Sequence, residues 1–388
     1  MRILIVNYEY PPLGGGGGVL ARTLVRELTR DHDVTVLTSR GPGLRPESYE
    51  DGARIVRVNV VHRTERERAS MASLISFGPA ARRAGARLIG NRADGRGFDL
   101  VHTFFAVPSG PAGIALSRRG GIPHLLTVCG ADIYDPTRPL SPERFAPVRA
   151  TVRRVVQTSS KVVAISRDLA GRTTALTGRS DIEIIGIGVE PEPIPARTRP
   201  AGDGGVTRFV TVARLVRRKA LGAVVRAVPD GCHLVVVGDG PERATLEHAA
   251  TPGRVTFAGA LDDTAKQQAL ADADAFVLAS LHEAFGIVYL EAMQAGLPVI
   301  AGTVGGQTDF LDDGVNALLV PPGDPVRLTE AMRAMAADPA RRTRMGTAAA
   351  QTAARYTPAA MTASYLSLYE AIRNDRTTQE GKHDRRGE

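Results

Sequence analysis

The sequence has few cysteines and no long hydrophobic run, and each scarcity argues against a class of protein. The two cysteines, Cys129 and Cys232, make no metal-binding pattern with histidines, so neither a disulfide framework nor a structural zinc site is expected. No apolar run approaches the ~20 residues that a membrane-spanning helix needs. Because the chain opens on a predicted strand with no cleavage motif behind it, we expect a cytoplasmic protein and not a secreted one.

Lysine is scarce as well, although the chain is basic. The 388 residues carry a formal net charge of +8, and almost all of the basic residues are arginines. Lysine occurs only at Lys161, Lys219, Lys266 and Lys382. A positive excess suits an anionic partner, such as a nucleotide, an acidic membrane surface or a nucleic acid. The charge alone does not choose among these partners.

Short runs of Val, Ile and Leu alternate with helical patterns along most of the chain. This alternation is typical of parallel sheets built from βαβ units. In the first half it predicts strands at 2–7, 33–38, 54–60, 99–104, 123–128, 161–165 and 182–185. In the second half the corresponding runs are RFVTVARL, HLVVVGDG, RVTFAGAL, AFVLAS, PVIAG and NALLV. The fold class is therefore α/β, with two Rossmann-like, doubly wound domains.

A proline-rich segment without periodicity, GVEPEPIPARTRPAGDGG, separates the two halves. The predicted divisions are an N-terminal domain at 1–188, a linker at 189–204, a second domain at 205–357, a terminal helix at 358–375 and a disordered tail at 376–388. We expect the terminal helix to pack back toward the N-terminal domain. Ligands of such sheets bind at the carboxyl ends of the strands, so a cleft between the domains is the expected site.

The most informative stretch is SLHEAFGIVYLEAMQAGLPVIAGTVGG, residues 280–306. It predicts a strand, a loop and then a helix from about Gly286 to Gln294. The free N–H groups of Phe285, Gly286 and Ile287 at the helix start suit a phosphate. Glu283 and Glu291 would flank the same anion, which fits carboxylates that hold sugar hydroxyls. The alternative is that Glu283 is a helix-start carboxylate and Glu291 a solvated one.

The spacing E-x7-E, followed by EAMQAGLPVIA, resembles the signature of retaining glycosyltransferases of family 4, which have the GT-B fold. The resemblance covers nearly the whole chain. It implies that Glu291 holds the nucleotide ribose and that Glu283 contacts the donor sugar near its reacting carbon.

The segment VARLVRRKA, residues 212–220, is similar to the family's G-R-L-x-x-x-K-G. The resemblance places Arg214 and Lys219 on the donor diphosphate, where cations stabilise the charge of the leaving group. The family's two glycines are replaced here by Ala213 and Ala220. With Glu283, these two cations are the predicted catalytic residues.

Two further glycines resemble donor contacts of the family. Gly238 in VVVGDGPE corresponds to the strand-end turn beside the nucleotide, and Gly259 in FAGAL to the loop that reads the base through its backbone. Uracil, guanine and adenine donors all occur in such enzymes. We expect UDP in preference to GDP or ADP.

Five glycines follow the first predicted strand, in YEYPPLGGGGG. The segment resembles the family's P-P-x-x-G-G loop, so Gly16, Gly17 and Gly18 are expected to bring bare backbone against the donor. The spacing Gly16-x-Gly18-x-x-Ala21 also fits a dinucleotide fingerprint and suggests an NAD(P)-dependent oxidoreductase as an alternative. However, the glycines stand too far from the strand, and the next strand ends in Thr38-Ser39 where an acidic ribose ligand is expected.

The N-terminal domain supplies the predicted acceptor or sugar side. Many family members carry a His where this chain has Cys129, in LLTVCGADIYDP, and Gly130 and Asp132 follow it. His102, at another predicted strand end, is a further candidate, although a lone histidine is more often structural. A retaining enzyme that works by same-face attack needs no base from the protein, so the exchange to cysteine leaves activity possible in principle.

We expect neither a cofactor nor a metal. Asp272 and Asp274 mimic a metal-binding D-x-D, but they lie at a helix-to-strand junction where acidic turn residues are common. Arg, Lys and helix ends would do the work of the metal.

The predicted function is transfer of a sugar from a nucleoside diphosphate sugar to a hydroxyl acceptor, in glycolipid, polysaccharide or natural-product glycoside synthesis. A non-catalytic protein that binds an anionic surface is the second alternative. Residues 62–90 mix arginines with Met71, Ile75 and other apolar residues, as an interfacial helix does, although such a segment is more often a domain helix with a solvated basic face. We therefore expect peripheral contact with the inner face of an anionic membrane, and no nucleic-acid partner.

Overall fold

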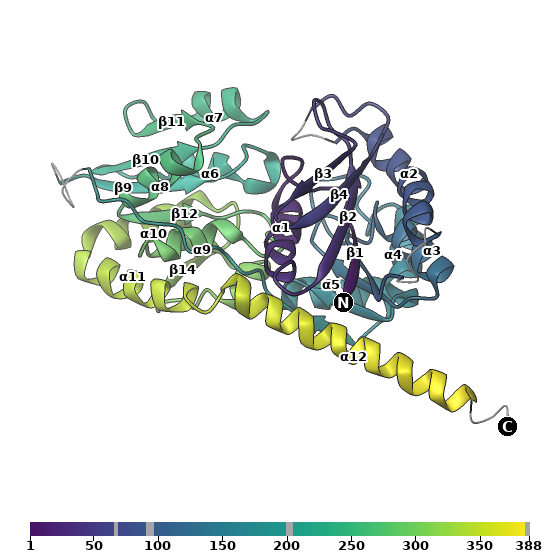
Figure 1. The fold of residues 1–388 in the computed structure, drawn as a ribbon. Helices are drawn as coiled ribbons and strands as arrows, with labels where there is room; N and C mark the ends of the chain where they lie inside the picture. Colours follow the sequence, from purple (N-terminus) through teal and green to yellow (C-terminus); the bar gives the residue numbers. More distant parts are fainter. Residues whose placement is uncertain (66–68, 91–96, 199–204, 385–388) are drawn as a thin grey trace. The chain divides into compact units, whose positions relative to one another are not determined.

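The computed structural model describes residues 1–65, 69–90, 97–198 and 205–384, which form two compact units. The first unit comprises Met1–Tyr134, Arg138–Gly188 and the chain from Pro358, and the second comprises Asp135–Thr137 and Val189–Thr357 (Figure 1). The break between the main parts of the two units therefore falls after Gly188. Of the expected linker, 189–198 belongs to the second unit and 199–204 lies outside the described residues.

The first unit is built on an eight-stranded sheet in the order β3-β4-β2-β1-β5-β6-β7-β8. Its strands are β1 Arg2–Val6, β2 Asp33–Ser39, β3 Glu47–Glu50, β4 Ala53–Val58, β5 Leu100–Phe104, β6 His124–Val128, β7 Lys161–Ala164 and β8 Ile182–Ile184. All neighbours are parallel except β3, which runs antiparallel to β4. The predicted strands are confirmed, whereas the polar edge strand β3 was not predicted.

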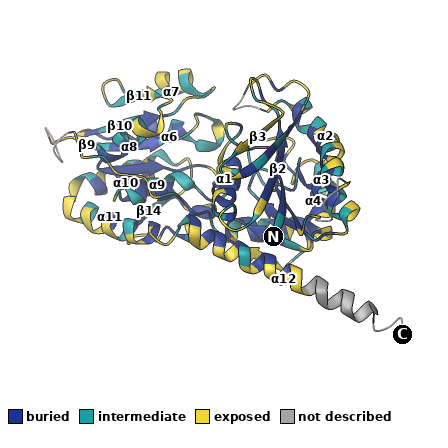
Figure 2. Ribbon diagram, in the orientation of Figure 1, coloured by how far each residue is buried: buried dark blue, intermediate teal, exposed yellow. Residues whose placement is uncertain are grey.

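Helices cover this sheet, and the buried residues of the unit lie mainly on the strands and on one face of the helices (Figure 2). The helices are α1 Gly16–Leu28, α2 Met71–Gly90, α3 Gly110–Gly120, α4 Ala146–Thr158, α5 Arg167–Thr177 and α12 Pro358–Asp384. None of the described helices is long and apolar enough to cross a membrane.

The helix α12 corrects the prediction of a disordered tail at 376–388. It continues to Asp384, and 385–388 lie outside the described residues. Residues 376–384 contain no proline, and Glu, Gln, Lys and Arg are good helix formers, so a polar composition alone does not end the helix.

The second unit is built on a six-stranded parallel sheet in the order β11-β10-β9-β12-β13-β14. Its strands are β9 Thr207–Val212, β10 Cys232–Val237, β11 Val255–Gly259, β12 Ala275–Leu278, β13 Val299–Gly302 and β14 Ala317–Val320. Its helices are η2 Arg217–Lys219, α6 Leu221–Ala227, α7 Arg243–Ala249, α8 Asp263–Ala271, α9 Ile287–Gln294, η3 Gly306–Asp309, α10 Pro325–Ala337 and α11 Pro339–Ala353. Every strand predicted here is confirmed.

His102 is part of the core of the first unit and not of a ligand site. Its side chain is fully buried, and its Nδ1 and Nε2 form hydrogen bonds with the hydroxyls of Tyr369 on α12, at 2.7 Å, and Thr127 on β6, at 2.8 Å. Burial, with the nearby His124, holds the pKa of His102 well below its ordinary value, so the ring is neutral. The prediction that His102 faces an acceptor is therefore wrong, because both ring nitrogens are used inside the fold.

This contact predicts that Tyr369→Phe destabilises the first unit. The change leaves Nδ1 of a buried imidazole without its partner, which costs about 1–3 kcal/mol. The melting temperature should fall by several degrees. Tyr49→Phe is the matched control, because Tyr49 is 77% exposed on β3. Equal melting temperatures for the two variants would contradict the structural role of the pair.

Candidate active site

The predicted residues of the second unit gather where its parallel strands end. Strands β9 and β12 are parallel neighbours, so the segments that follow them meet at the same edge of the sheet. The N–H of Leu281, after β12, donates to the carbonyl of Arg218 in η2 at 2.9 Å. This bond joins the segment that carries Lys219 to the loop that carries Glu283.

Glu283 and Lys219 form a buried ion pair. Nζ of Lys219 donates to Oε1 of Glu283 at 2.5 Å, and Oγ of Ser280 donates to the same oxygen at 2.6 Å. The Glu283 side chain is 7% exposed and that of Lys219 is 14% exposed. Burial raises the pKa of Glu283, but the charges of Lys219 and Arg218 lower it more, so the net pKa lies below the ordinary value. Glu283 is therefore a carboxylate at neutral pH.

The backbone of Glu283 is fixed by a close approach to the segment after β13. The N–H of Gly306 donates to the carbonyl of Glu283 at 2.7 Å. Gly305 has a φ of +121°, and a Cβ there would lie 2.4 Å from the same carbonyl oxygen. Only glycine fits this position, which the sequence analysis did not single out.

The helix α9 begins one residue after the predicted start. Its N-cap is Gly286, with a φ of +96°, and the first residue is Ile287. The first four N–H groups of an α-helix have no acceptor within the helix, so this end offers donors to an anion. The side chain of Phe285, in contrast, is only 2% exposed and packs against Phe310 and Tyr356.

Glu291, one turn into α9, has a lysine partner that belongs to no sequence motif. Nζ of Lys266, on α8, donates to Oε1 of Glu291 at 3.1 Å. No spacing rule connects residues on two different helices, so only the structure could bring this pair together. The alternative that Glu291 is a freely solvated residue is wrong, because its side chain is only 19% exposed.

Gly238 and Gly259 lie side by side at the ends of β10 and β11. The N–H of Gly238 donates to the carbonyl of Gly259 at 2.7 Å. Gly238 has a φ of +129°, and a Cβ there would lie 1.9 Å from the carbonyl oxygen of Ala213, beside the exposed Arg214. Both glycines therefore serve the packing of neighbouring strand ends.

In the first unit, the glycine run is mostly helix and not loop. Gly16, Gly17 and Gly18 form the first turn of α1, with Gly15 as its N-cap. A Cβ on Gly17 would lie 2.2 Å from Cζ of Phe105, so packing within the unit already requires a bare backbone there. The expectation that these glycines belong to a loop is wrong. The N–H of Gly18 donates to the carbonyl of Gly15 at 2.9 Å, so the N–H groups of Gly16 and Gly17 are the candidate donors to an anion at this helix start.

Asp132 holds two loops of the first unit together. Its Oδ2 accepts a hydrogen bond from the N–H of Ala106 at 2.7 Å, and its Oδ1 accepts from Cys129 at 3.1 Å and Gly130 at 2.8 Å. Burial raises the pKa of Asp132 to about 6 despite these donors. Burial and the nearby Asp132 also raise the pKa of the Cys129 thiol well above its ordinary value, so it is protonated. The Asp132 side chain thus positions backbone and is not left open to an acceptor.

Asp272 and Asp274 hold the segment that enters the second unit. Asp272 accepts hydrogen bonds from the N–H and hydroxyl of Thr198, and Asp274 accepts from Nη2 of Arg197 at 2.8 Å. Both carboxylates therefore have a role within the fold that does not involve a metal.

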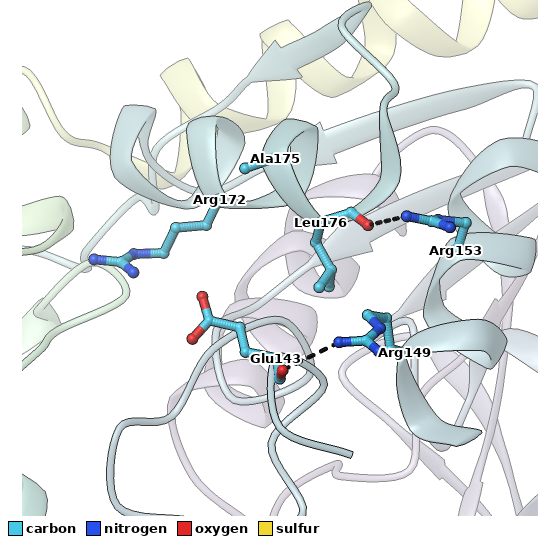
Figure 3. Close-up of a pocket in the computed structure, with 6 residues that line it drawn as sticks. All are labelled: Glu143, Arg149, Arg153, Arg172, Ala175 and Leu176. Atoms are coloured by element: carbon cyan, nitrogen blue, oxygen red, sulfur yellow. Dashed lines mark hydrogen bonds between the residues drawn. The ribbon is translucent and has the colours of Figure 1, made fainter. Parts of the chain in front are cut away.

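The first unit also has a pocket of about 480 Å³, which is lined by other residues. Figure 3 shows that α4, α5 and the loop before α4 supply its lining. Nη1 of Arg149 donates to the carbonyl of Glu143, and Nη2 of Arg153 donates to that of Leu176, each at 3.2 Å. It contains none of the predicted site residues.

Comparison with known proteins identifies relatives over nearly the whole chain. Residues 14–193 match the family model described as Glycosyltransferase Family 4, and 197–352 match Glycosyl transferases group 1. A glycogen synthase of Mycobacterium tuberculosis is 30% identical over 375 residues, with 90% of each chain covered. A GDP-mannose-dependent alpha-(1-6)-phosphatidylinositol monomannoside mannosyltransferase of Mycolicibacterium smegmatis is 29% identical, with 89% of this chain and 92% of the relative covered.

Two solved structures show the same fold. Sucrose-phosphate synthase from Thermosynechococcus elongatus has a TM-score of 0.83 at 21% identity, covering 96% of this chain and 99% of that one. Anabaena HepE in complex with UDP has a TM-score of 0.72 at 18% identity, and the match covers 96% of this chain and 100% of that one. The structural neighbours of this chain are GT-B glycosyltransferases, and its two parallel-sheet units have the GT-B fold.

The buried pair predicts a pH dependence of stability for Lys219→Met. In the wild type the pKa of Glu283 is lowered, so its stabilising effect is present above the unfolded carboxyl pKa of ~4.3 and is lost on acidification. In the variant only burial and weaker charges act on Glu283. At pH 7 the variant should lose about 3–5 kcal/mol in urea unfolding, and the gap should narrow below pH 4. In the double variant Lys219→Met/Glu283→Gln residue 283 does not titrate, so its gap to the wild type should narrow less, through the wild-type Glu283 alone. A gap that stays constant in Lys219→Met contradicts the pairing.

The contact of Gly17 with Phe105 predicts a second stability effect. Gly17→Ala should cost about 1–3 kcal/mol through overpacking, although alanine favours a helix. Gly15→Ala is the control, because a Cβ there meets no heavy atom within 4 Å. Phe105→Ala should remove most of the cost of Gly17→Ala. Thermal melts of these three variants and of the double variant Gly17→Ala/Phe105→Ala measure this, and equal stability of Gly15→Ala and Gly17→Ala would refute it.

Proposed function

The chain belongs to glycosyltransferase family 4, and from this premise we propose that it transfers a sugar from a nucleoside diphosphate sugar to a hydroxyl with retention of configuration. The observation that carries the proposal is the buried pair of Lys219 and Glu283 at the carboxyl edge of the second sheet. The bond that breaks joins the diphosphate to the sugar. The cation suits the diphosphate, and the carboxylate suits the sugar.

The strand order suggests a direction for the donor. Along the edge, the sheet presents first Gly259 and Gly238, then the segment of Arg214 and Lys219, and then Glu283. We propose that the base lies by the two glycines, the diphosphate by the two cations and the sugar by Glu283. Glu291, on the helix after β12, would hold the ribose.

The proposed chemistry is a same-face substitution at the anomeric carbon. The bond from this carbon to the diphosphate oxygen breaks, and the acceptor oxygen forms a new bond on the same face. The acceptor proton passes to the leaving phosphate oxygen, so the protein supplies no base. Lys219, Arg214 and the N–H groups at the start of α9 stabilise the charge that develops on the diphosphate. Glu283 orients the sugar through its hydroxyls.

We propose UDP as the donor nucleotide and a first-unit site for the acceptor. The complex of HepE with UDP supports the base, whereas the GDP-mannose-dependent relative makes GDP the competing choice. We propose that the helix start at Gly16, Gly17 and Gly18 faces the donor. The N–H groups of Gly16 and Gly17 are the proposed donors there, because the N–H of Gly18 already donates to the carbonyl of Gly15 at 2.9 Å.

We also propose a cytoplasmic location with contact to the inner face of an anionic membrane. On α2, Met71 is 50% exposed and Ile75 is 71% exposed, and the arginines 82, 83 and 87 lie on the same helix. Exposed apolar and basic residues on one helix suit an anionic lipid surface. The relative that acts on a phosphatidylinositol mannoside agrees with a lipid-linked acceptor.

The proposal predicts selective binding and a specific loss of turnover. In a thermal-shift panel, UDP and UDP-sugars should raise the melting temperature more than GDP, ADP or NAD, because a ligand of the folded state stabilises it. Lys219→Ala should lower turnover by about 10²-fold. EDTA should leave turnover unchanged.

Lys161→Ala is the matched control for the loss of turnover, because Lys161 starts β7 of the first unit. Stabilisation by NAD alone would favour an oxidoreductase, and wild-type turnover in Lys219→Ala would remove the catalytic assignment. Rescue of EDTA-treated protein by Mn²⁺ would contradict metal independence.

A further inference from the structure

Lys266 belongs to no motif, yet it contacts one of the two carboxylates of the E-x7-E spacing. Its Nζ lies 3.1 Å from Oε1 of Glu291, and their side chains are 17% and 19% exposed. The two residues are 25 positions apart and lie on α8 and α9, the helices before and after β12. Their contact therefore links α8 to α9 and is not a contact within one helix.

The contact occupies one carboxylate oxygen of Glu291 and leaves the other oxygen open to a ligand. Within the described parts of the chain, Oε1 accepts the hydrogen bond from Lys266, and Oε2 accepts none from another residue. A carboxylate held by one oxygen has its plane restricted, so the second oxygen points in a set direction. Such a carboxylate is ready to accept a hydroxyl proton from a ligand.

The charge on Lys266 persists despite its burial. Burial lowers the pKa of Lys266, but Glu291 raises it, and Asp263 at 3.3 Å adds to this, so the net pKa is above its ordinary value. Asp263 is 91% exposed, so solvent screens its effect, whereas Glu291 is the shielded partner. Lys266 is thus a fixed cation whose main buried contact is Glu291.

We propose that Lys266 is a positioning residue of the nucleoside subsite, an inference that rests on the proposed role of Glu291 at the ribose. Lys266 holds Oε1, so that Oε2 accepts hydrogen bonds from the ribose hydroxyls. Each carboxylate of the spacing then has its own lysine, Lys219 at Glu283 and Lys266 at Glu291. Without Lys266, the Glu291 carboxylate turns toward water and must be ordered again when the nucleotide binds.

The test compares a ribonucleotide with its analogue that lacks both ribose hydroxyls. Calorimetric titrations of UDP and 2′,3′-dideoxy-UDP, and of the matching GDP pair, use the full chain as wild type, Lys266→Met, Lys266→Arg and Asp263→Asn. Lys266→Met should weaken the ribonucleotide by about 10-fold and leave the dideoxy analogue unchanged. Lys266→Arg should restore most of the loss, since it keeps the cation. Asp263→Asn, which changes only the exposed partner, should match the wild type.

The outcomes separate this inference from the proposed function. Equal weakening of both ligands by Lys266→Met would assign Lys266 a general structural role and overturn the inference. Unchanged ribonucleotide affinity in that variant would overturn it too, with the proposed function intact. A wild type that binds nucleotides but does not distinguish the analogue would refute the ribose role of Glu291, and with it that of Lys266. A wild type that binds neither nucleotide pair would overturn UDP, and its competitor GDP, as the donor nucleotide of the proposed function.

Discussion

The candidate site depends on one buried ion pair, Lys219 with Glu283. Neither charge could be kept at such low exposure alone, because an unpaired buried ion is expensive. The pair forms because β9 and β12 are parallel neighbours and because Leu281 is hydrogen-bonded to Arg218. Its second effect is chemical, since the cation keeps the carboxylate ionised while burial acts in the opposite direction.

Around this pair, glycines let strand ends approach more closely than side chains would allow. Gly305 makes room for the carbonyl of Glu283, and Gly238 makes room for that of Ala213. Both have positive φ values, so the backbone conformation and the close contact require the same residue type. The polar groups of the edge are thus held by tight backbone packing, which is the rigidity that a site for a charged donor needs.

Most of the fold could be read from the sequence, because buried parallel strands are short apolar runs. The edge strand β3 was not predicted because its sequence, ESYE, is polar. At the site, Glu283, Lys219 and Glu291 followed from linear motifs, whereas Lys266 and Gly305 are brought there by tertiary packing. The predictions for His102 and Asp132 were wrong because the sequence does not reveal that a side chain is already bonded within the fold. His102 lies in the middle of β5 and not at its end, and Asp132 follows β6.

The central claim is that the carboxyl edge of the second sheet binds the donor nucleotide. The most direct test is a crystal structure of the chain grown with UDP. The account predicts the diphosphate within hydrogen-bond distance of Lys219 Nζ and the ribose hydroxyls on Glu291. A diphosphate held by residues of the first unit alone, with the pair of Lys219 and Glu283 untouched, would contradict it.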